Sequence, residues 1–463
     1  MKKTHQYTDN PNPRANIGFM CYVPLNYYVY KNIYKHLKNA EFIIGDEYDL
    51  PAQGLISDSV KQLADFFSKQ KVHWRFFNKS DGEYTPNEFF SKYSVLVSTW
   101  YRDSLKAPYN IDKKLVRVLY GQAKDPWNFG PWSSYFDLVL SYGKYSQKYL
   151  SIYGNSKIVG NPKFDSWFVK DLDKQELKNL TKKIDKSKTT VLYLPTHGLL
   201  SSMDMTVTAL NELSLTHNII VKAHHNNHLY EHRRTAAFKQ NNKIIYKSDS
   251  DDLLPLLAVS DVVISDNSGA IFDAVLADKP IILIDFLSKT FFQTYNDSIS
   301  YKIEGKFLGV ATSHRSIEQQ IKIPGKEIGP VIKITQENVV YGNQKSQIPI
   351  NIFQNSIDMA IENEKVYKIR RKQVRDSLFT NFDGSAGAKA ASEIKKLLYA
   401  PKPQRNFLAE SIDIYRDWLF GNPVATVIPP KIPTKKEEFK YYLSIRSLPF
   451  LKRISTVIKE FFT

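Results

Sequence analysis

The chain has 463 residues, of which 42% are hydrophobic and 24% are charged, and it contains one cysteine, Cys21. This composition indicates a globular protein of two or three domains and excludes an intramolecular disulfide, a cysteine-rich zinc site and an apolar membrane span. The 64 lysines and arginines exceed the 47 aspartates and glutamates, and the net charge of +17 favours phosphate-rich partners or an anionic membrane surface.

The beginning of the chain predicts alternating strands and helices. The polar start, MKKTHQYTDNPNPR, lacks the apolar segment of a signal peptide, so we expect a cytoplasmic location. An apolar run at 16–23 precedes a tyrosine-rich segment with helical spacing at 26–37. Further short apolar runs, each predicting a strand, lie at 41–44, 94–99, 115–119, 136–141 and 157–159. Their apolar character is continuous, which is typical of parallel strands covered on both faces.

A second strand–helix series follows a charged stretch at 170–188, which predicts an exposed linking helix. Its strands are predicted at 190–194, 218–222, 244–246, 261–265 and 280–285. The pattern predicts an α/β protein with two Rossmann-like domains that face a central cleft. We expect these domains at 1–165 and 166–400, with a helical appendage at 401–463, where proline-rich segments end the alternation.

Polar residues follow three strands of the second half, at the point where each strand ends. These candidates are Thr196, His197 and Gly198; then His224 and His225; then Asp266, Asn267, Ser268 and Gly269. The carboxyl ends of parallel strands share one edge of a sheet, where ligands bind. Backbone N–H groups at Ser268 and Gly269 suit a phosphate at a helix start. One such motif alone is more often a helix cap, but three at one edge favour a binding site.

Lysine and histidine side chains at the end of the strand predicted at 218–222 could bind a diphosphate. Lys222 and His224 are two residues apart, so on a strand they share a face, and His225 takes the other. His228 and His232 have the spacing of metal ligands on a helix, with Glu231 between them. The segment is not HExxH and its neighbours are basic, so we predict no metal site.

Four segments together resemble the CDP-glycerol glycerophosphotransferase family, the teichoic-acid and capsule polymerases and primases with a GT-B fold. They are VLYLPTHG at 191–198, VKAHH at 221–225, SDVVISDNSGAIFDAVLADKPIILID at 260–285 and FDGSAGAKAASEIKKLL at 382–398. The resemblance implies that the second half binds a CDP-activated alditol. It places five residues at the diphosphate and glycerol region: Thr196, His224, Ser268, Gly269 and Asp273.

The first half departs from the family at its acceptor motif, W-H-G-T-x-x-K. The aligned stretch is LYGQAK at 119–124, in which Gly121 matches and Tyr120 takes the place of the histidine regarded as the base; Lys124 is a further binding candidate in this stretch. A phenol with a pKa of about 10 is a poor base at neutral pH unless cations lower it. His197 also departs from the family, which leaves a base from the second half as an alternative, beside a hydrogen-bonded turn histidine.

The predicted function is transfer of a glycerol-phosphate, or related alditol-phosphate, unit from a CDP-activated donor to a hydroxyl of a cell-surface polymer or lipid-linked acceptor. CMP would be released, and no cofactor is expected. The alternative is a GT-B glycosyltransferase or 2-epimerase that uses a nucleotide-sugar donor. We expect no nucleic-acid partner, because helix-turn-helix, zinc and aromatic-basic RNA-binding patterns are missing from the sequence.

The appendage carries eight lysines and arginines and three acidic residues between Lys431 and Thr463, with apolar residues on one helical face. Such a helix can lie on anionic lipid at the inner face of the cell membrane, or pack on the protein body or a partner subunit. A lipid-linked acceptor favours peripheral membrane contact.

Overall fold

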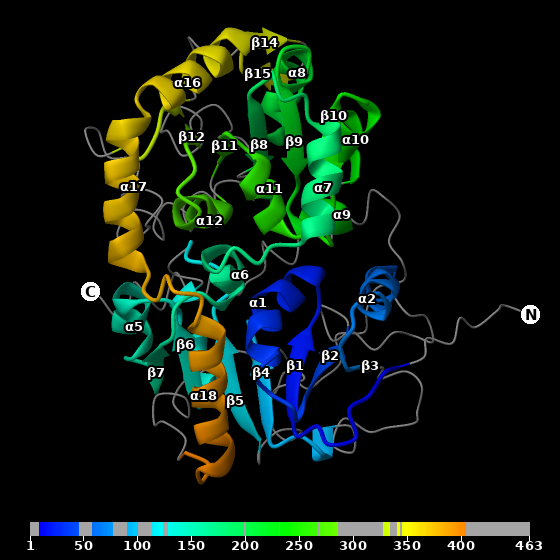
Figure 1. Cartoon of the computed structure of the whole chain (residues 1–463), viewed down its shortest axis with the longest axis vertical. Helices are drawn as coiled ribbons and strands as arrows, with labels where there is room; N and C mark the ends of the chain where they lie inside the picture. The colour runs from blue at the N-terminus through cyan, green and yellow to red at the C-terminus, as the bar shows by residue number, and fades with distance from the viewer. Residues whose placement is uncertain are drawn as a thin grey trace, which may run out of the picture.

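Two parallel sheets, one in each half of the molecule, form the framework of the structure (Figure 1). The computed structural model describes residues 9–45, 58–76, 90–100, 113–123, 128–198, 201–230, 232–266, 268–285, 327–333, 340–342 and 345–403. Lys124, Asn267 and the appendage from residue 404 onward lie outside the described residues. Among the helices that the structure describes, none combines the length and apolar character needed to cross a membrane.

The first sheet has seven strands in the order β3-β2-β1-β4-β5-β6-β7, all paired in parallel. The strands are β1 (Ile17–Cys21), β2 (Ala40–Ile44), β3 (Trp74–Phe76), β4 (Val95–Ser98), β5 (Lys114–Val118), β6 (Leu138–Ser141) and β7 (Ser156–Ile158). One face packs against α1 (Pro24–Tyr34), α2 (Asp58–Ser68) and α18 (Ala386–Tyr399). The continuous burial of β1 and β2 agrees with the predicted two-sided covering.

The second sheet has six parallel strands in the order β10-β9-β8-β11-β12-β13. The strands are β8 (Thr190–Leu194), β9 (Asn218–Lys222), β10 (Ile244–Lys247), β11 (Val262–Ser265), β12 (Ile281–Asp285) and β13 (Val331–Lys333). The helices of this half are α7 (Lys174–Lys183), α8 (Met203–Leu213), α9 (His225–Tyr230), α10 (His232–Gln240), α11 (Leu253–Val259), α12 (Ala270–Leu276), α16 (Ile350–Glu362) and α17 (Glu364–Leu378). A short antiparallel pair, β14 (Val340–Gly342) and β15 (Lys345–Gln347), lies beside α8.

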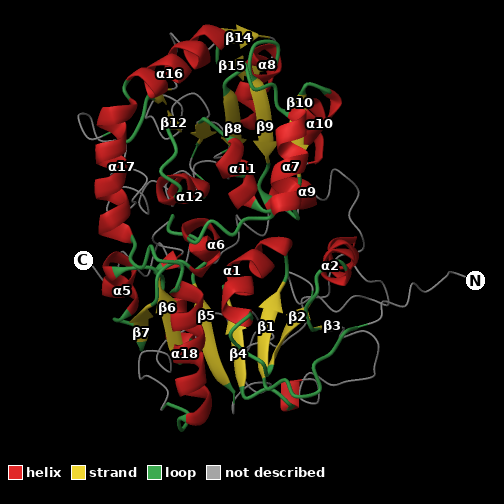
Figure 2. Cartoon of the chain, in the orientation of Figure 1, coloured by secondary structure: helices red, strands yellow, loops and turns green. Residues whose placement is uncertain are grey.

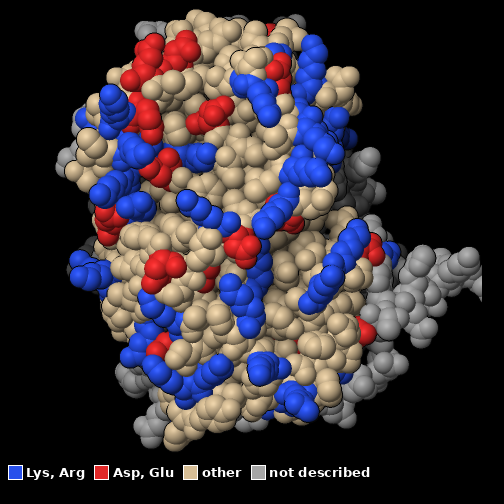
Figure 3. All heavy atoms as spheres, viewed as in Figure 1, with Lys and Arg blue, Asp and Glu red and all other residues tan. Residues whose placement is uncertain are grey.

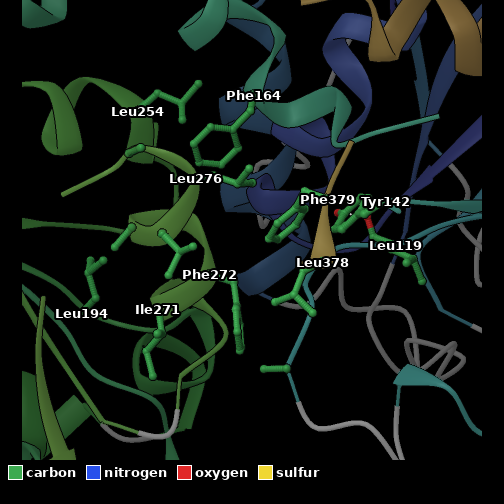
Figure 4. Close-up of a cluster of buried hydrophobic side chains, with 14 of the residues drawn as sticks. Leu119, Tyr142, Phe164, Leu194, Leu254, Ile271, Phe272, Leu276, Leu378 and Phe379 are labelled. Atoms are coloured by element: carbon green, nitrogen blue, oxygen red, sulfur yellow. The ribbon is translucent and has the colours of Figure 1, made fainter. Parts of the chain in front are cut away.

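The two halves meet through one continuous apolar cluster. It joins Leu119 and Tyr142 of the first half to Phe272 and Leu276 of α12 in the second half. Figure 4 shows these side chains with Phe164, Leu378 and Phe379 between the two halves. The strands run so that the carboxyl ends of both sheets face the middle of the molecule (Figure 2). The loops after the strands of one half are therefore directed towards those of the other.

The last described helix, α18, returns to the first half. Both oxygens of Asp165, which begins α6 (Asp165–Phe168), accept hydrogen bonds from the amide nitrogens of Ala386 and Gly387, at 3.0 and 2.7 Å. A Cβ at Gly387 would lie 2.2 Å from the carbonyl oxygen of Asn32, so only glycine allows this approach of α18 to α1. We expected residues 166–400 to lie together in the second half, whereas this helix packs on the first sheet.

The predicted strands are confirmed in both halves, and the charged stretch at 170–188 contains α7 as expected. Some elements were not predicted from the sequence: helix α2, the β14–β15 pair and the strands β3 and β13. The last two are three-residue strands, WRF and VIK, too short for a periodic pattern to distinguish them from a loop. Strand β3 lies at an edge of the first sheet and pairs with β2, and β13 lies at an edge of the second sheet and pairs with β12. In each case the neighbouring strand supplies the hydrogen bonds.

Candidate functional site

Three polar loops of the second half meet at one edge of its sheet. They follow β8, β9 and β11, which are neighbours in the strand order. The ring centroid of His197 lies 4.4 Å from that of His224, and the centroid of His224 lies 4.0 Å from that of His225. The three imidazoles form a continuous stack of tilted rings, which joins the ends of β8 and β9; a hydrogen bond from the Thr196 amide to Asp266 joins the end of β11 to that of β8.

The stack also corrects one expectation about the strand end. We predicted that His225 would point to the face opposite Lys222 and His224, as strand alternation requires. The strand β9 ends at Lys222 and α9 begins at His225, so alternation no longer applies. The two adjacent histidine rings therefore lie side by side.

Hydrogen bonds with neighbouring residues fix both the backbone and the ring of His224. Its amide nitrogen donates to Oδ1 of Asn227 at 2.9 Å, and its Nδ1 accepts the amide N–H of Asn226 at 3.2 Å. Because an N–H group occupies the Nδ1 lone pair, the proton of the neutral ring is on Nε2. His224 can therefore donate a hydrogen bond from Nε2 to an oxygen of a ligand.

Asp266 holds the loop that follows β8 through hydrogen bonds. Its Oδ1 accepts the amide N–H of Thr196 at 2.8 Å, and its Oδ2 accepts the amide and hydroxyl groups of Ser202 at 2.8 and 2.9 Å. The carboxylate is fully buried. The same loop is held at its other side, where Arg234 Nη1 donates to the carbonyl of Gly198 at 2.7 Å. Asp266 thus fixes the loop that carries the candidate residues.

Lys222 interacts with the loop that follows β10. Its Nζ donates to the carbonyl oxygen of Ser248 at 2.6 Å. Burial lowers the pKa of Lys222, while the nearby carboxylates of Asp249, Asp251 and Asp252 raise it. The ammonium group of Lys222 therefore interacts with the loop after β10 at the same sheet edge. In sequence, Lys222 lies two residues before His224.

The start of α12 faces the first half. Ser268 Oγ accepts the amide N–H of Ala270 at 3.3 Å, and Gly269 has helical dihedral angles. A Cβ at Gly269 would lie 3.5 Å from Cβ of Ala123, in the loop after β5. The donor-side turn and the acceptor-side motif predicted from the sequence are therefore in direct contact.

Asp273 lies one turn further along α12 and forms an ion pair between the two halves. Lys163 Nζ is 2.6 Å from Asp273 Oδ2, and the two side chains are 5% and 14% exposed. Burial raises the pKa of Asp273, and Lys163 opposes this effect. The sequence analysis missed Lys163, because nothing in the segment GNPKF at 160–164 indicates a partner 110 residues away.

The acceptor-side loop combines aromatic packing with open space. Tyr120 is half-buried, and its ring centroid lies 6.4 Å from that of Trp100. A Cβ at Gly121 would meet no atom within 4 Å, so the backbone there borders free volume. Below this loop, the hydroxyl of the buried Tyr142 donates to the carbonyl of Leu119.

The structure therefore assembles most of the predicted site residues around the facing sheet edges. In the described part of the chain, no group of three or more histidine, cysteine, aspartate or glutamate side chains is arranged to bind a metal ion. Lysine and arginine side chains are spread over both halves and alternate with acidic ones on the face shown in Figure 3.

Two facing parallel sheets with polar loops at their carboxyl ends define an α/β protein of GT-B-like fold. Residues 122–302 match the sequence model of the family described as CDP-Glycerol:Poly(glycerophosphate) glycerophosphotransferase. Over these residues the chain is similar to a family of glycerophosphotransferases, which agrees with the resemblance of the motifs at 191–198, 221–225 and 260–285 and indicates a transferase.

Solved structures show the same fold. A structure of the wall teichoic acid polymerase TagF soaked with CDPG has a TM-score of 0.53 and 15% identity, covering 84% of this chain and 89% of that chain. A second TagF structure has a TM-score of 0.51 and 14% identity, covering 84% and 91% of the two chains. The predicted GT-B-like fold is confirmed. No protein of curated function matches the sequence at a significant level.

Proposed function

We propose that this chain transfers a glycerol-phosphate, or related alditol-phosphate, unit from a CDP-activated donor to a hydroxyl group of a cell-surface polymer or a lipid-linked acceptor. The observation that carries the proposal is the contact of His197 with His224, which joins the ends of β8 and β9 beside the turn that faces Ala123. The family match supports the donor class, and TagF, which is similar in fold, is a wall teichoic acid polymerase.

In this reaction the acceptor hydroxyl oxygen forms a bond to the β-phosphorus of the donor. The bond between that phosphorus and the bridging oxygen breaks, and CMP leaves with the electron pair. The hydroxyl proton passes to a base on the protein. The protein's main contributions are positioning and neutralisation of phosphate charge, as in other phosphoryl transfers.

The side chains of the second half hold the donor. His224 donates from Nε2 to a phosphate oxygen, since its Nδ1 is occupied by the Asn226 amide. His197 and Tyr120 are the two candidates for the base, one on each side of the cleft. We favour His197, because an imidazole with a pKa near 6.5 accepts a proton at neutral pH more readily than a phenol does.

The remaining candidates line or support the donor site. Backbone groups of Ser268 and Gly269 face the phosphates, with Thr196 and Gly198 in the loop that Asp266 holds. His225 and Lys222 extend the same edge, and Asp273 keeps α12 against the first half through Lys163. Gly121 leaves room for the acceptor. Lys124 and Asn267 belong to the same two loops, and their roles stay predictions.

Donor titration tests the proposal. We expect CDP-glycerol or CDP-ribitol to bind more tightly than UDP-sugars or CMP-sugars, measured by calorimetry, and to release CMP when a glycerol-phosphate acceptor is added. Tight binding of the sugar nucleotides alone would instead establish the alternative, a nucleotide-sugar enzyme. Peripheral membrane contact through the appendage also stays a prediction, which sedimentation with anionic vesicles would check.

A further inference from the structure

Two arginine side chains are completely buried in the described part of the chain, and they differ in their partners. Arg371 Nη2 lies 3.2 Å from Oδ1 of Asp278 and 2.6 Å from Oε1 of Glu364, so two carboxylates balance its charge. Arg117, on β5, has no carboxylate partner among the described residues. Burying a guanidinium without a counter-charge costs several kcal/mol.

The groups around Arg117 are neutral. Its Cζ lies 3.9 Å from the ring centroid of Trp132, its Nη1 donates to Oγ of Ser133 at 2.8 Å, and its Nη2 is 3.5 Å from Oδ1 of Asn128. Its Nε has no hydrogen-bond partner. Burial lowers the pKa of Arg117 to about 9, so the side chain is still cationic at neutral pH. A cation–π contact contributes only about 0.5 to 2 kcal/mol, which is less than the cost of the buried charge.

Further unpaired polar atoms lie in the same segment. Gln122 is 1% exposed, and neither its Oε1 nor its Nε2 has a partner. Ser134 Oγ, next to the serine that Arg117 contacts, is also buried and unpaired. Buried polar groups are almost always hydrogen-bonded, so a concentration of unpaired atoms among the described residues marks a place where a polar ligand or water would be stabilised.

These residues connect to the proposed site through short contacts. Asn128, which Arg117 approaches through Nη2, donates from Nδ2 to the carbonyl of Ala123. Ala123 follows Gln122 and lies against Gly269, at the start of α12. The unpaired guanidinium is therefore linked through Asn128 to the loop that contains Ala123. This loop faces Gly269, in the turn proposed to bind the donor phosphates.

We propose that Arg117 and Gln122 form a binding site for a phosphate group, which supplies the missing counter-charge of the arginine. A guanidinium matches the geometry of phosphate oxygens, and the Gln122 amide adds a donor for a further oxygen. The phosphate belongs either to the donor diphosphate or to a phosphodiester of the acceptor. The source of the phosphate rests on the proposed function, whereas the unpaired charge does not.

Calorimetric binding of three probes tests this site: CDP-glycerol, inorganic pyrophosphate and glycerophosphoglycerol. We expect Arg117→Gln to weaken at least one of them by tenfold or more and to reduce the salt dependence of binding, while Arg117→Lys retains part of the affinity. Arg371→Gln is the matched control, because it removes an equally buried arginine that already has carboxylate partners. We expect it to lower the melting temperature and to leave the affinities unchanged.

The probes also distinguish the source of the phosphate. Weaker binding of CDP-glycerol alone assigns the site to the donor, and weaker binding of glycerophosphoglycerol alone assigns it to the acceptor. Wild-type affinity of Arg117→Gln for all three probes would overturn the proposal. If the wild-type protein binds pyrophosphate through Arg117 but does not turn over CDP-glycerol, the phosphate site stands and the proposed function fails.

Discussion

Single residues of the candidate site depart from the family pattern at the positions proposed to carry protons. Tyr120 takes the place of the family's histidine in the first half, and two further histidines flank His224 in the second. The amide of Asn226 fixes the tautomer of His224, so this ring serves as a hydrogen-bond donor. The proposed base is His197, one of the two imidazoles that contact the ring of His224.

We expect His197→Gln to lower kcat by about 100-fold or more, because a general base contributes 10²- to 10⁴-fold to such a step. Tyr120→Phe should change kcat by less than about tenfold, since a phenol contributes little as a base near neutral pH. Steady-state rates of CMP release from pH 5.5 to 9 would compare the two variants. The reverse order of effects, with Tyr120→Phe nearly inactive, would assign the base to the first half.

At the scale of secondary-structure elements, α12 links the site to the interface between the halves. Its N-terminal turn contains Ser268 and Gly269, its Phe272 and Leu276 enter the apolar cluster, and its Asp273 pairs with Lys163. The ion pair and the apolar contacts lie on one short helix. A change in the packing of this helix is therefore expected to alter the proposed donor site and the interface together.

Lys163→Met should destabilise the protein by about 3 to 5 kcal/mol, because it leaves Asp273 buried without its partner. Burial already raises the pKa of Asp273, and the loss of Lys163 raises it further. The carboxyl is protonated in both the folded and unfolded states below about pH 4, so the deficit is small there and grows as the pH rises to 7.

Urea unfolding at several pH values measures this effect. The double variant Lys163→Met, Asp273→Leu is the control and should recover most of the lost stability, since it removes both charges. A deficit that is the same at pH 4 and pH 7 would show that the ion pair is not its cause.

For the molecule as a whole, the described part of the chain passes from the first half to the second and then back again. It leaves the first half after β7 and returns after α17, when α18 docks on α1. Lys114 Nζ donates to the carbonyl of Leu398 at 2.8 Å, and Ala390 and Ile394 are completely buried in the core of the first half. The end of the described chain therefore completes the first domain and restrains the second.

Gly387→Leu tests this docking. The added side chain begins 2.2 Å from the carbonyl oxygen of Asn32, which is backbone and cannot move aside. We expect a loss of about 3 kcal/mol or more. In hydrogen exchange, protection should fall in β1 and β4 rather than in β8 and β11. Gly121→Ala is the control for stability, because a Cβ there meets nothing within 4 Å. Equal loss of protection in both sheets would contradict the docking role.

Local sequence patterns were enough to predict the alternation of strands and helices, the fold class and the resemblance to the family. These depend on local patterns, since hydrophobic runs, turn residues and motif order are read within short segments. The strand-end clusters also predicted that these loops meet, because the carboxyl ends of parallel strands share an edge.

The tertiary structure alone decided which side chains meet. The stack of His224 on His197, the pairing of Lys163 with Asp273 and the docking of α18 join segments separated by 27, 110 and more than 200 residues, and none is encoded in a local pattern. The unpaired charge of Arg117 is likewise invisible in the sequence. Whether a buried cation has a partner depends on how distant segments pack, and this packing is a property of the folded chain as a whole.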